Sequence, residues 1–526
     1  MPARRAASPA ASENTRLLGS DTSFNSSRED LEDVTAKHQR TPLPKKQLGV
    51  LFSIRFSEPV LYSHLYPYIN QFVRDIGVAG NDSRNVGFYS GMIESVFAFG
   101  EVCSIFVLSR LSDRIGRRPV LLPSAAGIGI FTALFGLSTS FTMMLILRIF
   151  AGLLAGGTPI VHSIVSELTD ETNNAIAIPI YGLITPIGFA IGPLIGGTLE
   201  HAATKYPHIF GYEFLRKYPY FLPSFVPSCL AVLGVILGYF FLEETLPSKV
   251  KQEKAERRKS SCSTSSDSST LYGATDSCRG LSEPGSVEAE EEEESDARPK
   301  GIKALVKDPS IRAIMGSGTF LMFLYTSFDV LFSLYCFTAV EDGGVGLPPN
   351  KIGYAFSVAG CIAMLMQLCI TPWVLRTFDK AKVYNFCMCT FPVVFCLMGC
   401  LNPIARAGYD EASQSFRPAT TSLLYATIAV LLLLARVCVM AFPISMILIK
   451  QNASKHSLAS ANGLVQVSMT IARAVCPTLS SSIFAYSTSH NILGGHFWVV
   501  IMMAISMAGI WQSTNIARTA RRKAER

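Results

Sequence analysis

Long apolar runs without charge are the feature that most constrains the fold of this chain. Such runs recur along the sequence, for example at residues 120–137, 228–242, 423–434 and 497–510. A helix that crosses a bilayer needs about 20 predominantly apolar residues. Only 16% of the residues are charged, against roughly 25% in an ordinary soluble domain. The sequence therefore predicts an all-α, multi-pass membrane protein and argues against a soluble enzyme.

Hydropathy and the polar residues between the apolar runs divide the chain into twelve expected spans. They are residues 47–69, 87–109, 119–137, 142–165, 175–199, 218–242, 311–339, 350–373, 383–401, 420–450, 457–486 and 494–513. We expect one six-helix bundle over 47–242 and a second over 311–513. Segments 1–46 and 243–310 contain too few apolar residues to bury a core, so we expect both to be disordered. Residues 514–526 form a basic tail, and two six-helix halves are the layout of transporters built from structural repeats.

Lys and Arg are concentrated in alternate loops. The N-terminal tail has eight, the loop 110–118 has four, the central segment has eleven and the C-terminus has five. In the other set, the loops 138–141, 341–349 and 487–491 have none, and the longer loops 200–217 and 402–419 have three and two. The positive-inside rule therefore predicts that both termini and the central segment are cytosolic, with the acidic loop 166–174 as a local exception. Because the net charge of +7 is spread over these loops, we expect no nucleic-acid partner. Residues 1–46 lack the apolar core of a signal peptide, so the first span is expected to direct membrane insertion.

Cysteine usage gives no sign of a metal or redox site. Of 13 cysteines, all but Cys262 and Cys278 fall in expected spans, and no CxxC pair or Cys/His cluster with zinc spacing occurs. We therefore expect no disulfide, no metal and no cofactor. The sequence also has no GxxxxGK[ST] phosphate-binding loop, so transport energy would come from an ion gradient or from the gradient of the solute.

The basic loop between the second and third spans carries an ordered motif. It reads Ser109-Arg-Leu-Ser-Asp113-Arg114-Ile-Gly116-Arg117-Arg118. The cations alone would serve as a topology signal, but the order also makes a tight reversal whose carboxylate can meet the N-terminus of another helix. The run resembles the loop signature of the major facilitator superfamily of transporters, in which the Asp and Arg residues latch the two halves together on the cytosolic side. The resemblance implies that Asp113 faces the start of span eleven, near residues 455–458.

The fifth span contains glycines at helical spacing. The run is Gly188-Phe-Ala-Ile-Gly192-Pro193-Leu-Ile-Gly196-Gly197. Glycines at i, i+4 and i+8 share one helix face and permit close approach of a neighbouring backbone, and Pro193 is expected to kink the helix. A packing seam explains this pattern by itself. The run also resembles the span-five signature of proton-coupled antiporters in the same superfamily, so we favour antiport over other coupling modes.

Two further sets of residues extend the resemblance. The run Arg148-Ile-Phe-Ala-Gly152-Leu-Leu-Ala-Gly156 looks like the span-four motif of the family, in which the Arg is associated with proton transfer. Residues 55–59, 65–75, 85–91 and 461–464, with Arg473, resemble the zinc-induced facilitator-like group, particularly its fungal members. This resemblance implies the major facilitator fold with 12 transmembrane helices in two six-helix bundles. It leaves the substrate open, because the cargoes of that group are diverse.

Ionisable residues inside the expected spans are the best functional candidates, because charge is expensive to place in a bilayer. We assign a role in proton coupling to Arg55, Glu58, Glu94, Glu101, Arg148, Asp329 and Arg473. Arg55 and Glu58 are three residues apart and can pair on one helix face, either as a permanent structural pair or as a switched one. Glu94 and Glu101 lie two turns apart on one face of span two, where a desolvated carboxylate can exchange a proton. Arg436, in span ten, is compatible with a simple bundle anchor.

Aromatic residues cluster in spans one and seven. At helical spacing such residues are more often packing than ligand cage, but pseudo-symmetry of the two halves would point some of them toward a central site. We predict an amphipathic pocket for an organic solute lined by Tyr62, His64, Tyr66, Tyr325 and Phe328.

The N-terminal tail carries one candidate address signal. Glu13 lies four residues before the pair Leu17-Leu18, a spacing that resembles signals read by sorting adaptors. Such signals direct proteins to vacuoles or lysosomes, so we favour the vacuolar membrane over the plasma membrane.

Together these features predict a monomeric secondary transporter in the lipid bilayer, and not an enzyme. It would exchange a small molecule or ion for protons by alternating access. The alternatives are a uniporter or symporter on the same scaffold, or a membrane nutrient receptor that does not transport. Drugs, polyamines, metal chelates, organic anions and potassium all remain candidate cargoes.

Overall fold

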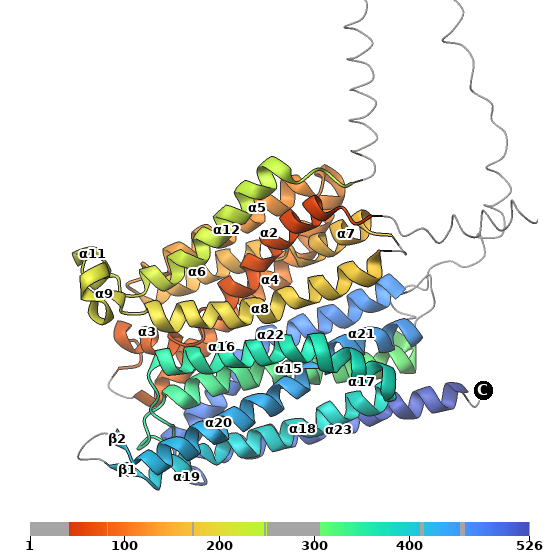
Figure 1. The fold of residues 1–526 in the computed structure, drawn as a ribbon. Coiled ribbons are helices and arrows are strands. Elements are labelled where there is room, and N and C mark those ends of the chain that lie inside the picture. Colours follow the sequence, from red (N-terminus) through yellow and green to blue (C-terminus); the bar gives the residue numbers. More distant parts are fainter. Residues whose placement is uncertain are drawn as a thin grey trace, which may run out of the picture.

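The computed structural model describes residues 42–80, 83–170, 173–246, 249, 306–410, 415–452 and 458–524. Within these residues the chain is almost entirely helical, and the long helices run along one common axis (Figure 1). The sorting motif predicted at Glu13, Leu17 and Leu18, and most of the two segments predicted to be disordered, lie outside the described residues.

The N-terminal half contains six passes along the common axis. Its elements are α2 (Lys45–Ser63), α3 (Ile69–Ile76), η1 (Ser83–Asn85), α4 (Val86–Ile115), α5 (Arg118–Phe135), α6 (Phe141–Leu154), α7 (Thr158–Leu168), α8 (Asn174–Leu199), α9 (Ala202–Lys205), α10 (Pro207–Phe210), α11 (Glu213–Lys217) and α12 (Phe221–Phe241). The fourth pass is divided into α6 and α7 at residues 155–157, two of which are glycine.

The C-terminal half contains the other six passes. Its elements are α15 (Pro309–Phe337), α16 (Pro349–Leu365), the π-helix η2 (Met366–Ile370), α17 (Thr371–Thr377), α18 (Lys380–Gly399), α19 (Leu401–Arg406), the antiparallel pair β1 (Tyr409–Asp410) and β2 (Ser415–Phe416), α20 (Pro418–Val439), α21 (Ala441–Asn452), α22 (Leu458–Ser489) and α23 (Phe497–Ala524). The last helix continues through most of the segment predicted to be a basic tail.

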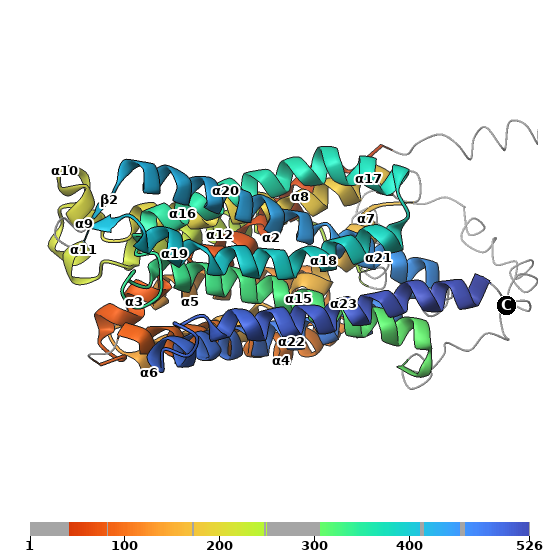
Figure 2. The same ribbon diagram turned by 90° about the horizontal axis from the view of Figure 1, so that it is seen from below.

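The two ends of the bundle are distinct (Figures 1 and 2). At one end, called here the tail end, α2 and α15 begin and α12 and α23 end. The opposite end, called the hairpin end, carries α9–α11 and the β1–β2 pair. Ten passes are long and apolar enough to cross a membrane, counted over the described residues. The other two are α2, which contains Arg55 and Glu58, and α22, which is rich in Ser and Thr.

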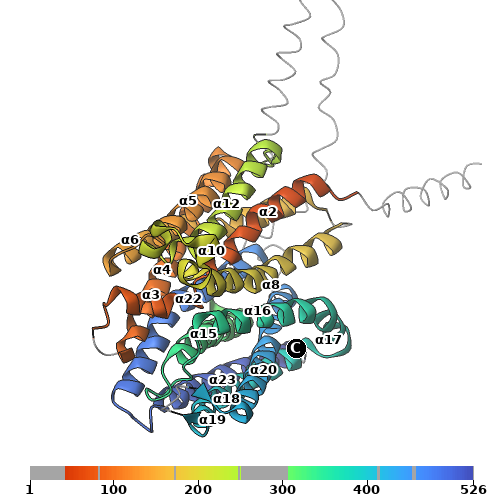
Figure 3. The same cartoon turned by 60° about the vertical axis from the view of Figure 1, so that its left-hand side comes forward.

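The halves meet along two seams, α4 against α22 and α8 against α16 (Figure 3). Small residues bring the backbones together at both seams. A Cβ atom added to Gly360 of α16 would lie 2.5 Å from the backbone nitrogen of Ala190 in α8, and one added to Gly91 of α4 would lie 2.6 Å from the carbonyl of Pro477 in α22. Close helix contact of this kind is the usual way in which helices associate in a bilayer, where the hydrophobic effect does not drive them together.

Candidate functional site

A buried ion pair joins α15 to α20 in the C-terminal half. Nη2 of Arg436 lies 3.2 Å from Oδ1 of Asp329, and the two side chains are 4% and 1% exposed. The guanidinium also lies over the rings of Tyr325 and Phe328, at 5.8 and 5.9 Å. Arg436 is therefore the counter-ion of Asp329, a role that the sequence analysis did not assign to it.

A second ion pair connects the two halves. Arg473 of α22 contacts the carboxylate of Glu101 in α4, and its guanidinium lies 5.3 Å from the ring centre of Tyr62 in α2. Glu101 is buried, whereas a quarter of the Arg473 side chain is exposed. Two residues predicted separately to be functional thus form one contact across the α4–α22 seam.

Glu94 is the one buried acid of the described residues that forms no ion pair. It lies two turns from Glu101 in α4 and is 4% exposed. Its Oε2 has no hydrogen-bond partner, and no ion pair joins it to a cation in the part of the chain that the structure describes. The buried Arg148 of α6 is also held without a carboxylate, over the rings of Phe97 and Phe135 at 4.8 and 5.3 Å. Arg148 acts on Glu94 through its electrostatic field.

The pair predicted between Arg55 and Glu58 is confirmed, with an N–O distance of 2.5 Å. Nε of Arg55 donates to the hydroxyl of Tyr181 at 3.1 Å, and Thr158 donates to Glu58 at 3.0 Å. All these partners belong to the N-terminal half. The contacts therefore favour the structural alternative for this pair over a switched one.

Aromatic rings form a continuous belt across the middle of the molecule. Successive members are Tyr62, Tyr66, Phe356, Phe332 and Phe328, with ring centres 5.6, 5.5, 5.2 and 5.7 Å apart. We call these five residues the aromatic belt. Because they come from α2, the segment after it, α16 and α15, the belt is built by both halves. Three of the five residues predicted to line a substrate pocket belong to it.

The other two predicted pocket residues, Tyr325 and His64, lie in different surroundings. Tyr325 lies beside the belt, where its ring contacts Phe442 at 5.5 Å. His64 is completely buried, and neither ring nitrogen has a hydrogen-bond partner among the described residues. Its backbone packs against the glycine face of α8, where a Cβ added to Gly192 would lie 3.0 Å from its nitrogen. His64 is thus enclosed within the N-terminal half rather than aligned with the belt.

The glycine motif of α8 provides two packing faces. Gly188, Gly192 and Gly196 face α2, and a Cβ added to Gly188 would lie 2.6 Å from Pro59. Gly197 faces the other half, where an added Cβ would lie 2.8 Å from the carbonyl of Pro349. The predicted close approach is confirmed, and α8 remains one helix through Pro193. This packing accounts for the glycines whatever the coupling mode.

The loop predicted to act as a latch forms a charged network inside the N-terminal half. Asp113 pairs with Arg117 at 2.5 Å, and Arg117 also pairs with Glu167 at 3.0 Å. Glu167 belongs to the acidic loop 166–174, the exception to the charge rule, and it is a counter-ion of Arg117. The contact predicted between Asp113 and residues 455–458 falls mainly outside the described residues.

Glu244 completes this network. It was not predicted as a site residue because it lies in the segment 243–310, which was predicted to be disordered. Its two carboxylate oxygens accept the backbone N–H groups of Arg117 and Arg118 at 2.8 and 3.1 Å. An acid at the start of a helix satisfies N–H groups that have no partner in the helix. Gly116 has a φ of +119° and an added Cβ would lie 2.6 Å from this carboxylate, so the reversal requires glycine. Arg114 lies in the last turn of α4.

At the hairpin end, polar and cation–π contacts join the two halves. Asn70 donates to Ser333 at 3.1 Å, Arg84 pairs with Asp342 at 3.4 Å, and the guanidinium of Arg74 lies 4.8 Å from the ring centre of Phe337. Each contact joins α3, η1 or their neighbours to α15 or the loop that follows it.

A histidine cluster lies beside these contacts. His201 is 2.8 Å from Oε2 of Glu200 and 3.4 Å from Oδ2 of Asp75, and Lys205 and Tyr220 complete the cluster by contacting Glu200 and Asp75. Hydrogen bonds to Asp75 and Glu200 raise the pKa of His201 to about 9, against partial burial, which lowers it. The cluster ties α3, α8, α9 and α12 into one unit.

Comparison with known proteins identifies the family. Residues 51–477 match the Major Facilitator Superfamily. The chain is 75% identical, over the full length of both proteins, to the major facilitator-type transporter psiT2 of Psilocybe cyanescens. It is 25% identical to the protein ZINC INDUCED FACILITATOR 1 of Arabidopsis thaliana, over 90% of this chain and 92% of that one.

The fold agrees with that assignment. The structure resembles the crystal structure of a bacterial homologue of the human lysosomal transporter Spinster, in an inward-facing and occupied conformation, with a TM-score of 0.63 and 11% identity over 91% of this chain and 98% of that one. The two six-pass halves are those expected from the sequence motifs. The chain belongs to the major facilitator superfamily, and it is a membrane transporter rather than an enzyme.

Proposed function

We propose that this transporter exchanges a small organic solute for protons, with Glu94 as the residue that carries the proton. The observation that carries this proposal is that Glu94 is buried without a cationic partner in the described part of the chain, whereas Glu101 and Asp329 each have one. An ionised carboxylate enclosed in protein without a cation in direct contact is costly. Binding a proton removes that cost, and access of water to the site restores the charged form.

The charges around the aromatic belt favour a cationic or polarised aromatic solute. With the pairs Asp329–Arg436 and Glu101–Arg473 neutral overall, Glu94 and Arg148 determine the net charge of the interior. The interior is neutral when Glu94 is ionised and positive when it is protonated, so an organic cation binds better to the ionised form. A solute and a proton that exclude each other from one site are exchanged in opposite directions, because linkage between two ligands is reciprocal. The rings of the belt supply faces on which a cation can rest.

Alternating access would follow from the way the halves meet. The contacts at the hairpin end close that end, while the ion pair of Glu101 and Arg473 lies deeper in the α4–α22 seam. We propose that the tail end is cytosolic, as the distribution of Lys and Arg favours, and that the halves rock about the belt. The network of Asp113, Arg117 and Glu167 would stiffen the tail end of the N-terminal half during this motion. The vacuolar membrane remains the favoured location, and a monomer the expected unit.

Proteoliposomes test the coupling directly. Purified protein is reconstituted with a pH-sensitive dye inside, and a panel of aromatic amines, aromatic acids and neutral aromatic solutes is added outside. We expect amines to drive proton movement in the opposite direction. In Glu94→Gln, amine exchange for amine should persist while coupled proton movement is lost. The matched control is Glu213→Gln, an exposed acid of α11, which should behave like the unmodified protein.

Each alternative gives a different result in the same assay. Coupled proton movement that survives in Glu94→Gln would refute the assignment of the carrier. Solute flux without proton movement would indicate a uniporter, and proton movement in the same direction as the solute would indicate a symporter. Solute binding without any flux would indicate a receptor.

A further inference from the structure

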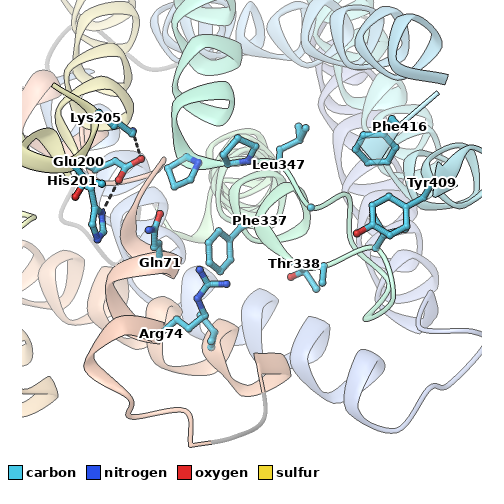
Figure 4. A pocket seen from close by; sticks show the side chains of 17 residues that line it. Gln71, Arg74, Glu200, His201, Lys205, Phe337, Thr338, Leu347, Tyr409 and Phe416 are labelled. Atoms are coloured by element: carbon cyan, nitrogen blue, oxygen red, sulfur yellow. Dashed lines mark hydrogen bonds and ion pairs between the residues drawn. The ribbon is translucent and has the colours of Figure 1, made fainter. Parts of the chain in front are cut away.

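A cavity of about 630 Å³ opens between the two halves at the hairpin end (Figure 4). The N-terminal half contributes Gln71, Arg74, Glu200, His201 and Lys205 to its wall. The C-terminal half contributes Phe337, Leu347, Pro348, Tyr409 and Phe416. None of these residues belongs to the aromatic belt, on which we propose that the transported solute rests. The cavity is therefore separate from that transport site. Its volume lies within the range of roughly 300–1,000 Å³ that is typical of small-molecule sites.

The polar wall of this cavity has an excess of positive charge. Glu200 is its acid, and it is already neutralised by Lys205 and by His201. Asp75, next to Arg74 in the chain, is held by His201 and Tyr220. Arg74 acts on Asp75 through its charge but forms no ion pair with it among the described residues, where its own contact is with the ring of Phe337, at 4.8 Å. Its planar guanidinium therefore keeps its N–H donors available at the cavity, and this group binds carboxylates and phosphates through two parallel hydrogen bonds.

The opposite wall is apolar and aromatic. Phe337 stacks on Arg74, and Leu347 continues the surface toward the rings of Tyr409 and Phe416 (Figure 4). A flat hydrocarbon body fits such a wall, whereas a small inorganic ion would leave it exposed to water. The two walls together define a ligand with an anionic group at one end and an aromatic body at the other.

We propose that this cavity is a second ligand site, for a small soluble aromatic anion, and that its occupancy holds the hairpin end closed. Because each half supplies one wall, the site exists only while the halves are in contact at this end. A ligand that binds one of two conformations shifts the equilibrium toward it. At a free concentration 100 times its Kd, the shift is about 100-fold. Such a ligand would act as an inhibitor of transport without entering the transport site, and this part of the proposal rests on the alternating access proposed above.

Calorimetry on protein in nanodiscs of zwitterionic lipid tests the site without requiring transport. The probes are 2-naphthoate, 2-naphthamide and 2-naphthylmethylammonium, which share a ring system and differ in charge. We expect 2-naphthoate to bind at one site per protein. The amide and the ammonium probe should bind at least ten times more weakly. Equal binding of the three probes would overturn the proposal. Loss of 2-naphthoate binding on adding phosphatidylglycerol to the nanodisc would also overturn it, because the occupant would then be a lipid headgroup.

Single substitutions test whether 2-naphthoate binds at this cavity. Arg74→Gln should weaken 2-naphthoate by about 10- to 150-fold, the range for a hydrogen bond between charged groups, and Arg74→Lys should recover part of the loss. Arg216→Gln, an exposed cation of α11 at the same end of the molecule, should leave the affinity unchanged. Unchanged affinity in Arg74→Gln would refute the site. If binding depends on Arg74 but saturating 2-naphthoate does not slow solute flux in proteoliposomes, the claim of closure is wrong. If no solute flux occurs at all, the proposed transport mechanism fails while the calorimetry still decides the site.

Discussion

The pair formed by Asp329 and Arg436 should be the most costly single contact to break. Both side chains are almost completely buried, at 1% and 4% exposure, so neither charge can be hydrated when its partner is removed. Asp329→Asn leaves the guanidinium without a counter-charge. Breaking a buried pair in this way typically destabilises a protein by about 3–5 kcal/mol. Since each 1.4 kcal/mol is a factor of ten, the unfolding equilibrium should shift by roughly 100-fold to a few thousand-fold.

A double-mutant cycle separates the loss of the pair from the loss of either side chain. We expect Arg436→Met to destabilise like Asp329→Asn, and the double variant to be substantially more stable than either single one, because no unpaired charge then remains. Unfolding is followed by titration of mixed micelles with a denaturing detergent. The exposed Glu213→Gln serves as the control and should leave the midpoint unchanged.

Two results would contradict this reasoning. Single variants within about 1 kcal/mol of the unmodified protein would show that the pair is hydrated, as surface pairs are. A double variant that is as unstable as the sum of the two single ones would show that the side chains stabilise the fold independently. If the double variant regains stability but not transport, the pair has a functional role in addition to its structural one.

Three further predictions concern backbone geometry and titration. Gly196→Ala places a Cβ against the backbone of His64, directly after α2, and should reduce the yield of folded protein in size-exclusion chromatography, whereas Gly463→Ala, with no atom within 4 Å of its added Cβ, should not. His201 should stabilise the protein fully below its ordinary pKa of 6.5 and lose this contribution as pH rises through about 9. His201→Gln should therefore flatten the loss of stability between pH 7 and pH 10, and an unchanged slope would exclude this origin. Gly116→Ala should lower stability by about 1–3 kcal/mol in the detergent titration, because its φ of +119° is strained for other residues, and a midpoint equal to that of the unmodified protein would refute this.

The sequence predicted the passes well because hydropathy and loop charge are local properties. Even α2 and α22 were recognised as passes, although one contains an ion pair and the other many hydroxyl groups. The breaks within passes were not predicted. The division between α6 and α7, and the π-helix between α16 and α17, occur in apolar sequence, where composition alone does not distinguish a straight helix from an interrupted one.

Separation along the sequence explains which ion pairs of the candidate site could be predicted. The pair Arg55–Glu58 was predictable because its members are three residues apart in one helix. Asp329 and Arg436 are 107 residues apart, and Glu101 and Arg473 are 372 apart. Sequence patterning identified most of these residues as unusual, but only the packing of α15 on α20 and of α4 on α22 assigns each acid its partner.

These ion pairs bear on which acid would carry the proton in the exchange that we propose. Protonating Asp329 or Glu101 would leave Arg436 or Arg473 without its counter-ion, so each such step would leave one cation unpaired for every acid that it neutralises. Protonating Glu94 removes a charge that no ion pair satisfies in the described part of the chain. Moreover, Arg148 is held by the faces of two rings rather than by a carboxylate, so it keeps its contacts in both states. Under the proposed exchange, the interior would therefore gain and lose one proton at Glu94 while its other contacts stay formed, which is the property that repeated turnover requires.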